Sequence, residues 1–109
     1  TPKNLILTNK YLLKQQKTQI KSVVDKKNKI IPPVYIGENV NIFNSKIGPN
    51  VSIEDNVYIK NSTIKNSIIQ NDVVIKNADL NKSIFGKFSK YNPDSKSLIM
   101  GPFSNFNRK

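Results

Sequence analysis

The chain has 109 residues, of which 18 are Lys or Arg and 7 are Asp or Glu, so its formal net charge at pH 7 is +11. It contains no Cys and no His, which excludes disulfides, thiolate metal sites and mechanisms that need an imidazole base or ligand. The length suits one small domain, and no apolar run approaches the roughly 20 residues of a membrane span, so we expect no membrane partner.

The first predicted element is a helix over residues 1–16. Thr1 suits the N-cap and Pro2 suits the first turn. Apolar residues then recur at helical spacing, at Leu5, Ile6, Tyr11, Leu12 and Leu13. Residues 17–32 are polar and rich in Lys, and we expect a linker with one short edge strand. Pro32 and Pro33 stiffen the end of this segment.

A repeat fills residues 33–85. Each unit has a small or branched residue, one variable residue and then a large apolar residue, and this period of two is typical of a short strand. The corners between units are only two or three residues long. The ten units are Val34-x-Ile36, Val40-x-Ile42, Ser45-x-Ile47, Val51-x-Ile53, Val57-x-Ile59, Ser62-x-Ile64, Ser67-x-Ile69, Val73-x-Ile75, Ala78-x-Leu80 and Ser83-x-Phe85.

Every third unit of this repeat falls into one of three columns. Within a column the step is 16 or 17 residues, as from Val34 to Val51 and from Val40 to Val57. Three columns in fixed register predict a three-sided parallel solenoid with one strand per face. Asn or Asp recurs at two corners, where these residues tolerate left-handed backbone angles, and we expect stacked ladders there. The positions are Asn39, Asn56 and Asp72, and Asn44, Asn61 and Asn77.

The units at residues 36–40, 47–51 and 53–57 are similar to the hexapeptide repeat of left-handed parallel β-helices, and the left hand is implied by this resemblance. The predicted fold is therefore mainly β: a left-handed parallel β-helix of about 3–4 coils over residues 33–109, preceded by one α-helix. Residues 86–109 are expected to form a capping segment, in which the pattern resumes at Leu98, Met100, Ser104 and Phe106. A loosely packed tail is the alternative for the same residues.

Residues 1–13 resemble the segment that leaves the catalytic domain of sugar-1-phosphate nucleotidyltransferases, which has the form Gly-Thr-Pro followed by a Leu-rich helix with Asn-Arg-Tyr-Leu-Leu. Lys10 stands where Arg is usual. With residues 30–37 leading into the coil, most of residues 1–86 is similar to the C-terminal region of the long-form glucose-1-phosphate thymidylyltransferase or uridylyltransferase family. The resemblance implies that this sequence is a fragment of a longer enzyme, and the absence of Cys leads us to expect a cytoplasmic location.

In that family a sugar 1-phosphate attacks a nucleoside triphosphate, with Mg²⁺, and pyrophosphate is released. The resemblance places the nucleotide loop and metal carboxylates in an N-terminal domain outside this sequence. We therefore expect a catalytically silent, oligomerising and stabilising domain that holds no cofactor and meets sugar phosphate and nucleotide only through the other domain. Mg²⁺ is expected for the full-length enzyme.

Two other functions remain open. The first is an acyltransferase-like β-helix, but its usual His base is absent, and Ser45 and Ser62 point into the coil without a base. The second is a non-enzymatic scaffold or nucleic-acid binder. The basic residues are all Lys until Arg108, whereas Arg is the better partner for phosphate forks and base edges, so we expect no nucleic acid. The repeat's lysines lie at corners or outward positions, namely Lys46, Lys60, Lys65, Lys76 and Lys82.

The outward positions of the repeat predict an assembly surface. Ile68 and Ile84 align on the first face, and we expect them to be covered either by the N-terminal helix or by a neighbouring subunit. A homo-oligomer is predicted, a trimer in preference to a dimer. Its candidate interface residues are Tyr35, Ile68, Ile84, Tyr58 and Val74.

Overall fold

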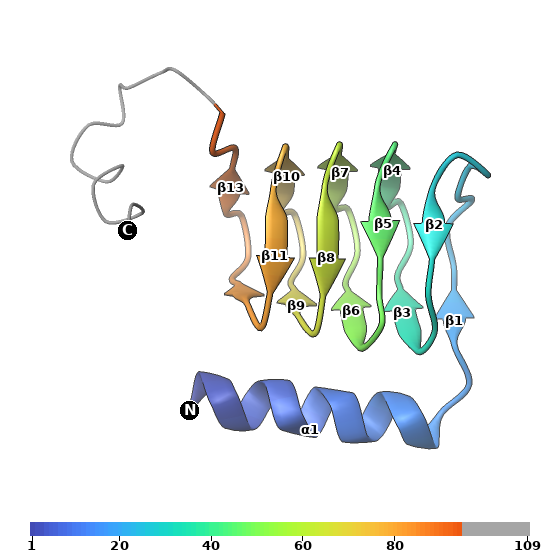
Figure 1. Ribbon diagram of the computed structural model, residues 1–109, viewed down its shortest axis with the longest axis vertical. Helices are drawn as coiled ribbons and strands as arrows, with labels where there is room; N and C mark the ends of the chain where they lie inside the picture. Colours follow the sequence, from blue (N-terminus) through green and yellow to red (C-terminus); the bar gives the residue numbers. More distant parts are fainter. Residues whose placement is uncertain (95–109) are drawn as a thin grey trace.

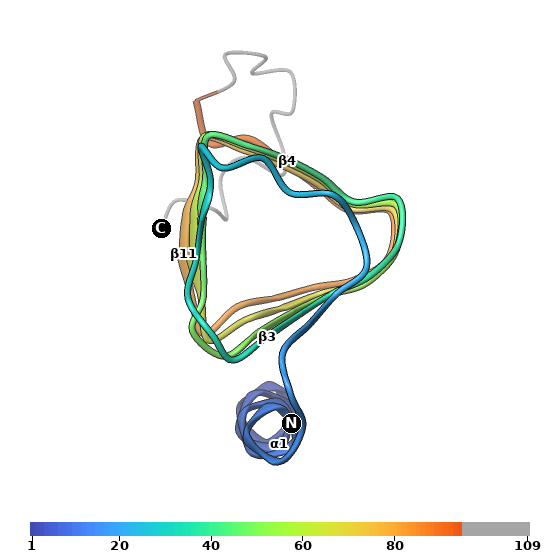
Figure 2. The ribbon, with the colours of Figure 1, turned by 90° about the vertical axis from the view of Figure 1, so that its right-hand side faces the viewer.

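The computed structural model describes residues 1–94, which form one helix and a three-sided β-solenoid (Figures 1 and 2). Helix α1 (Pro2–Gln15) comes first. Sheet A stacks β1 (Gln19–Ile20), β3 (Val34–Ile36), β6 (Val51–Ile53), β9 (Ile68–Ile69) and β12 (Ile84–Phe85). Sheet B stacks β2 (Lys29–Ile30), β5 (Lys46–Ile47), β8 (Thr63–Lys65) and β11 (Asp79–Asn81). Sheet C stacks β4 (Asn41–Phe43), β7 (Tyr58–Lys60), β10 (Val74–Lys76) and β13 (Lys90–Tyr91).

The strands pair in parallel, and the chain visits the sheets in turn. Seen from the first coil, the chain runs from β3 to β4 and on to sheet B in the counterclockwise sense while it recedes from the viewer (Figure 2). This sense defines a left-handed coil. The predicted fold class is therefore confirmed, including the single helix that precedes the solenoid.

The number of coils was predicted too low. Sheet A holds five strands, so the solenoid has about five turns rather than three to four. The additional coil comes from β1 and β2, which lie upstream of Pro33 and pair with β3 and β5. The predicted cap residues Leu98, Met100, Ser104 and Phe106 lie outside the described residues.

The interior consists of the predicted columns. Val34 pairs with Val51 and Ile36 with Ile53, so like side chains stack on one another from coil to coil. Burying each Ile stabilises the fold by about 1.5–3 kcal/mol, and the stack extends through the whole solenoid. The side chains that are completely or almost completely buried include Ile36, Ile47, Ile53, Ile59, Ile64, Ile69 and Ile75.

The corners are built on left-handed residues, as predicted. Asn44 and Asn61 have φ values of 49° and 50°, and the Asn44 side-chain amide donates to Asn61 Oδ1 at 2.8 Å. The ladder continues from Asn61 to Asn77 and from Asn77 to Asn92. A third corner was not predicted, although Asn50 and Asn66 precede the units that begin at Val51 and Ser67. Its ladder runs through Asn50, Asn66 and Asn81.

The serines that point inward form hydrogen bonds rather than only filling space. Ser62 Oγ donates to the Lys60 carbonyl at 2.9 Å and accepts from the Ala78 N–H at 3.1 Å. Ser45 repeats this arrangement one coil earlier, where its Oγ donates to the Phe43 carbonyl and accepts from the Ser62 N–H. These hydroxyls satisfy buried backbone groups, which is a structural role.

The first coil also covers the edge of β4 with side chains. Ser22 Oγ accepts from the Val40 N–H at 2.9 Å, and the Asn28 amide donates to the Ile42 carbonyl at 2.9 Å. Asn28 Oδ1 additionally accepts from the Ser45 N–H at 2.8 Å. An unpaired strand edge is a template for unwanted pairing, and these side chains occupy the backbone groups at this one.

Candidate functional site

Helix α1 lies along the outer surface of sheet A (Figures 1 and 2). Fourteen residues span about 21 Å at 1.5 Å per residue, close to the width of five strands at about 4.8 Å per spacing. Leu13 is buried, and Ile6 and Asn9 are half-buried at the same helical spacing. Ser52 Oγ donates to Asn9 Oδ1 at 2.5 Å, which joins the helix to the central strand of the sheet.

The predicted interface residues lie on two faces of the solenoid. Tyr35, Ile68 and Ile84 are half-buried in sheet A, the sheet along which α1 lies. Tyr58 and Val74 are half-buried neighbours in sheet C, in direct register with each other. The structure therefore does not bring the five residues together into one surface.

Sheet C carries an aromatic pair that sequence reasoning missed in part. The rings of Phe43 and Tyr58 are 5.5 Å apart between centroids, and Lys76 Nζ lies 5.6 Å from the centre of the Tyr58 ring. The Phe43 side chain is 46% exposed. Phe43 follows the buried Ile42, so the period of two already placed it on the outer surface. It was overlooked because it falls outside the three-residue unit.

Helix α1 also exposes apolar side chains on both flanks of the surface that faces away from sheet A, with Leu7 and Tyr11 on one flank and Leu5 and Leu12 on the other. We call this group the outer patch of α1, and it consists of Leu5, Leu7, Tyr11 and Leu12, which are 48–63% exposed. Scattered single apolar residues are normal on protein surfaces, but Leu7 and Tyr11 are exposed neighbours at i, i+4 spacing on the helix. This patch is the main apolar surface of the helix that the solenoid does not cover.

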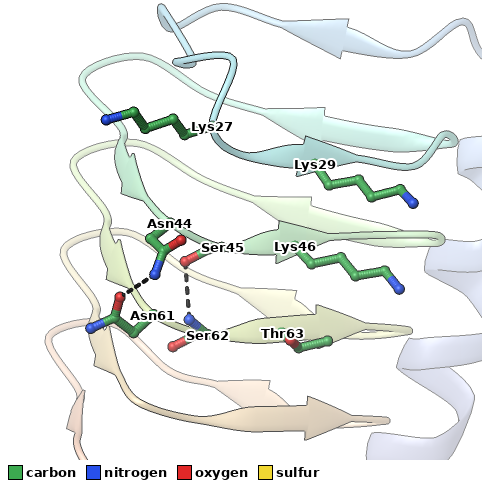
Figure 3. Close-up of a pocket in the computed structure, with 8 residues that line it drawn as sticks. All are labelled: Lys27, Lys29, Asn44, Ser45, Lys46, Asn61, Ser62 and Thr63. Atoms are coloured by element: carbon green, nitrogen blue, oxygen red, sulfur yellow. Dashed lines mark hydrogen bonds between the residues drawn. The ribbon is translucent and has the colours of Figure 1, made fainter.

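A shallow groove of about 370 Å³ lies where sheets C and B meet on the first coils (Figure 3). Lys29 and Lys46 are register partners on β2 and β5, and their side chains extend side by side in the close-up. Lys27 comes from the turn before β2 and lies on the other side of Asn44 and Ser45. We call this the lysine groove, and it is lined by Lys27, Lys29, Asn44, Ser45, Lys46, Asn61, Ser62 and Thr63.

The chemistry of the described residues is limited. Within residues 1–94 there is no group of three or more His, Cys, Asp or Glu side chains that could hold a metal ion. The same part of the chain contains no helix with the length and apolar character needed to cross a membrane. The Ser45 and Ser62 hydroxyls are already engaged with the backbone, so neither is prepared as a nucleophile.

Comparison with family models, with curated proteins and with solved structures finds no match to this chain. The class of this protein is assigned from its geometry alone: the stacked parallel strands and the sense of the coil are those of a left-handed β-helix.

Proposed function

We propose that this chain is a non-catalytic assembly and stabilising domain, and that it associates into a homo-oligomer, a trimer in preference to a dimer. The observation that carries the proposal is the outer patch of α1. The helix already buries Leu13 against the solenoid, yet it still exposes Leu7 and Tyr11 at i, i+4 spacing. A helix with apolar residues on both sides is suited to lie between two packed bodies.

The filled interior supports a structural role. The solenoid core is a continuous stack of Ile and Val, which leaves the outside as the place for any partner. Tyr58 and Val74 on sheet C remain proposed as further contact residues. Tyr35, Ile68 and Ile84 are proposed to act through α1, since the helix lies along their sheet.

The parent protein in this proposal is a cytoplasmic sugar-1-phosphate nucleotidyltransferase. Support comes from the resemblance of residues 1–13 and from the order of a helix followed by a β-helix. The Mg²⁺ and nucleotide chemistry of such an enzyme needs acidic ligands that the described residues do not group together, so we assign it to a separate catalytic domain. The absence of Cys is in keeping with a reducing compartment.

The assembly proposal is tested with a double variant of the outer patch. Leu7→Lys with Tyr11→Lys is expected to lower the mass in solution to that of one chain while the circular dichroism stays unchanged. Gln16→Lys with Gln19→Lys is the matched control, because both residues are exposed, follow the helix instead of lying on its outward surface, and undergo the same change of charge. Dissociation in neither variant, or in both, would contradict the assignment of the contact to this patch.

The parent activity has a separate test. A longer protein that carries this chain is expected to release pyrophosphate from a nucleoside triphosphate when a sugar 1-phosphate and Mg²⁺ are present, and the 109-residue chain alone is expected to release none. Failure of the longer protein to do so would reject the nucleotidyltransferase context and leave the assembly role standing.

A further inference from the structure

The lysine groove places like charges opposite one another without a carboxylate among its lining residues. Lys29 and Lys46 are direct register partners on parallel strands, whose backbones lie about 4.8 Å apart. Like charges directly opposite on a sheet are destabilising, and natural sheets commonly relieve them with an opposite charge. The next positions in this outward column are Thr63 and Asp79, so the column reaches its acidic residue only two strands beyond Lys46.

The acidic residues are concentrated at another corner of the solenoid. Glu38, Glu54, Asp55 and Asp72, four of the seven, lie where sheets A and C meet. Two of these carboxylates are engaged with the backbone there: Asp55 Oδ1 accepts from the Glu38 N–H at 2.9 Å, and Glu54 Oε1 accepts from the Asn71 N–H at 3.2 Å. These four acidic residues therefore lie at a different corner from the lysine groove, which is where sheets C and B meet.

Asp25 is the acidic residue closest in sequence to the groove. Its side chain accepts a hydrogen bond from the Lys27 backbone N–H at 3.1 Å, and its carbonyl accepts from the Asn28 N–H at 3.0 Å. Asp25 therefore shapes the turn from which Lys27 projects. The turn is fixed further by Asn28, whose buried amide is bonded to the backbone of coil two. Hydrogen bonds therefore hold the backbone of the turn that carries Lys27 and leads into Lys29.

We propose that the lysine groove binds a small phosphate-bearing anion. Lys29 and Lys46 point the same way and take a phosphate group between their ammonium groups, whereas the Lys27 side chain points to the opposite side of Asn44 and Ser45 (Figure 3). The Thr63 hydroxyl is an additional donor at the groove. The volume of about 370 Å³ is at the small end of the roughly 300–1,000 Å³ typical of ligand sites, and its polar lining suits an ionic ligand.

The occupant is a small anion rather than a nucleic acid. Lysines act as point charges for phosphate, whereas a reader of bases is expected to use Arg forks, and the groove has no Arg. The described residues contain no Arg at all, since the chain's single Arg is Arg108. Binding through exposed ammonium groups is expected to weaken steeply with added salt.

The test uses the complete 109-residue chain and sodium tripolyphosphate as the probe, with calorimetric titration and thermal melting against sodium chloride of equal ionic strength. Tripolyphosphate is expected to raise Tm by several degrees over the salt control. Lys29→Gln with Lys46→Gln is expected to weaken binding at least tenfold. Lys60→Gln with Lys76→Gln is the matched control, because this pair is also in register, removes the same charge and lies outside the groove.

Equal weakening in the two double variants would show a general response to net charge and overturn the proposal. No tripolyphosphate binding by the parent chain would overturn it as well. A 12-nucleotide single strand tested alongside separates the two sources of phosphate: binding of the oligonucleotide without binding of tripolyphosphate would reject the small anion. In the remaining case, the acidic corner of a second copy occupies the groove, and tripolyphosphate dissociates the two copies. Light scattering with and without tripolyphosphate identifies this case, which would also overturn the proposal.

Discussion

Ser52 on β6 and Asn9 on α1 are 43 residues apart in the sequence, and their side-chain oxygens are 2.5 Å apart in the fold. This hydrogen bond lies at the middle of the surface where the helix crosses sheet A. Leu13 is buried toward the C-terminal end of the same helix, next to the first coil. The helix is therefore an integral part of the solenoid, and it keeps the outer patch in a fixed orientation.

Leu13→Asp is expected to release α1 from sheet A. The change places a carboxylate in an apolar contact that is only 7% exposed, and it should cost at least about 2 kcal/mol of docking free energy. Hydrogen exchange of the helix amides is the measurement, and it should accelerate at least tenfold. Leu12→Asp is the control, because it makes the same change at a neighbouring helical residue that is 48% exposed. Equal exchange in the two variants would contradict the docking of the helix through Leu13.

Ile64→Asp is expected to unfold the solenoid. Ile64 is fully buried on β8, and an unpaired carboxylate there costs several kcal/mol, a large fraction of the stability of a small domain. Thr63→Asp is the control on the outward side of the same strand, where the side chain reaches solvent. Thermal melting followed by circular dichroism should show that the Thr63→Asp variant is folded and that the Ile64→Asp variant is unfolded. Similar melting of both variants would mean that the inward column is wrongly assigned.

Substitutions at Asn61 separate two contributions of a corner residue to the free energy of unfolding: its left-handed backbone angle and its side-chain hydrogen bonds in the ladder. Asn61→Gly keeps the left-handed angle accessible and loses the hydrogen bonds with Asn44 and Asn77, which should cost about 1 kcal/mol. Asn61→Ala loses these bonds and adds a left-handed penalty of about 1–2 kcal/mol. Denaturant unfolding should therefore rank the parent above Gly and Gly above Ala. An alanine variant as stable as the glycine variant would remove the conformational argument for these corners.

The columns could be read from the sequence because one physical rule generates them: a prism with short corners must bury every second residue of each unit. The first coil was not predicted from the sequence because its units are less regular. Thr18-x-Ile20 lies 16 residues before Val34, and the Thr18 hydroxyl accepts from the Val34 N–H, so the column does extend upstream. In the third column Asn28 stands 17 residues before Ser45, where Ser or Ala is the usual residue.

The surface was harder to predict than the interior. Lys27 and Lys29 belong to the segment expected as a linker, so the pairing of Lys29 with Lys46 could not be predicted until β2 was placed beside β5. The position of α1 was also open, since helical periodicity identifies an apolar side but does not say which sheet it contacts. The outward positions of Ile68 and Ile84 predict cover by the helix or by a neighbouring subunit, and the helix lies along their sheet (Figure 2).

The mass of the 109-residue chain in solution, measured by light scattering over a range of concentrations, tests the central claim most directly. An assembly domain is expected to give the mass of three chains, or of two chains in the alternative arrangement, and to keep it on dilution through the low micromolar range. A single-chain mass at every concentration would contradict the account, because the outer patch of α1 would then have no second copy to cover it.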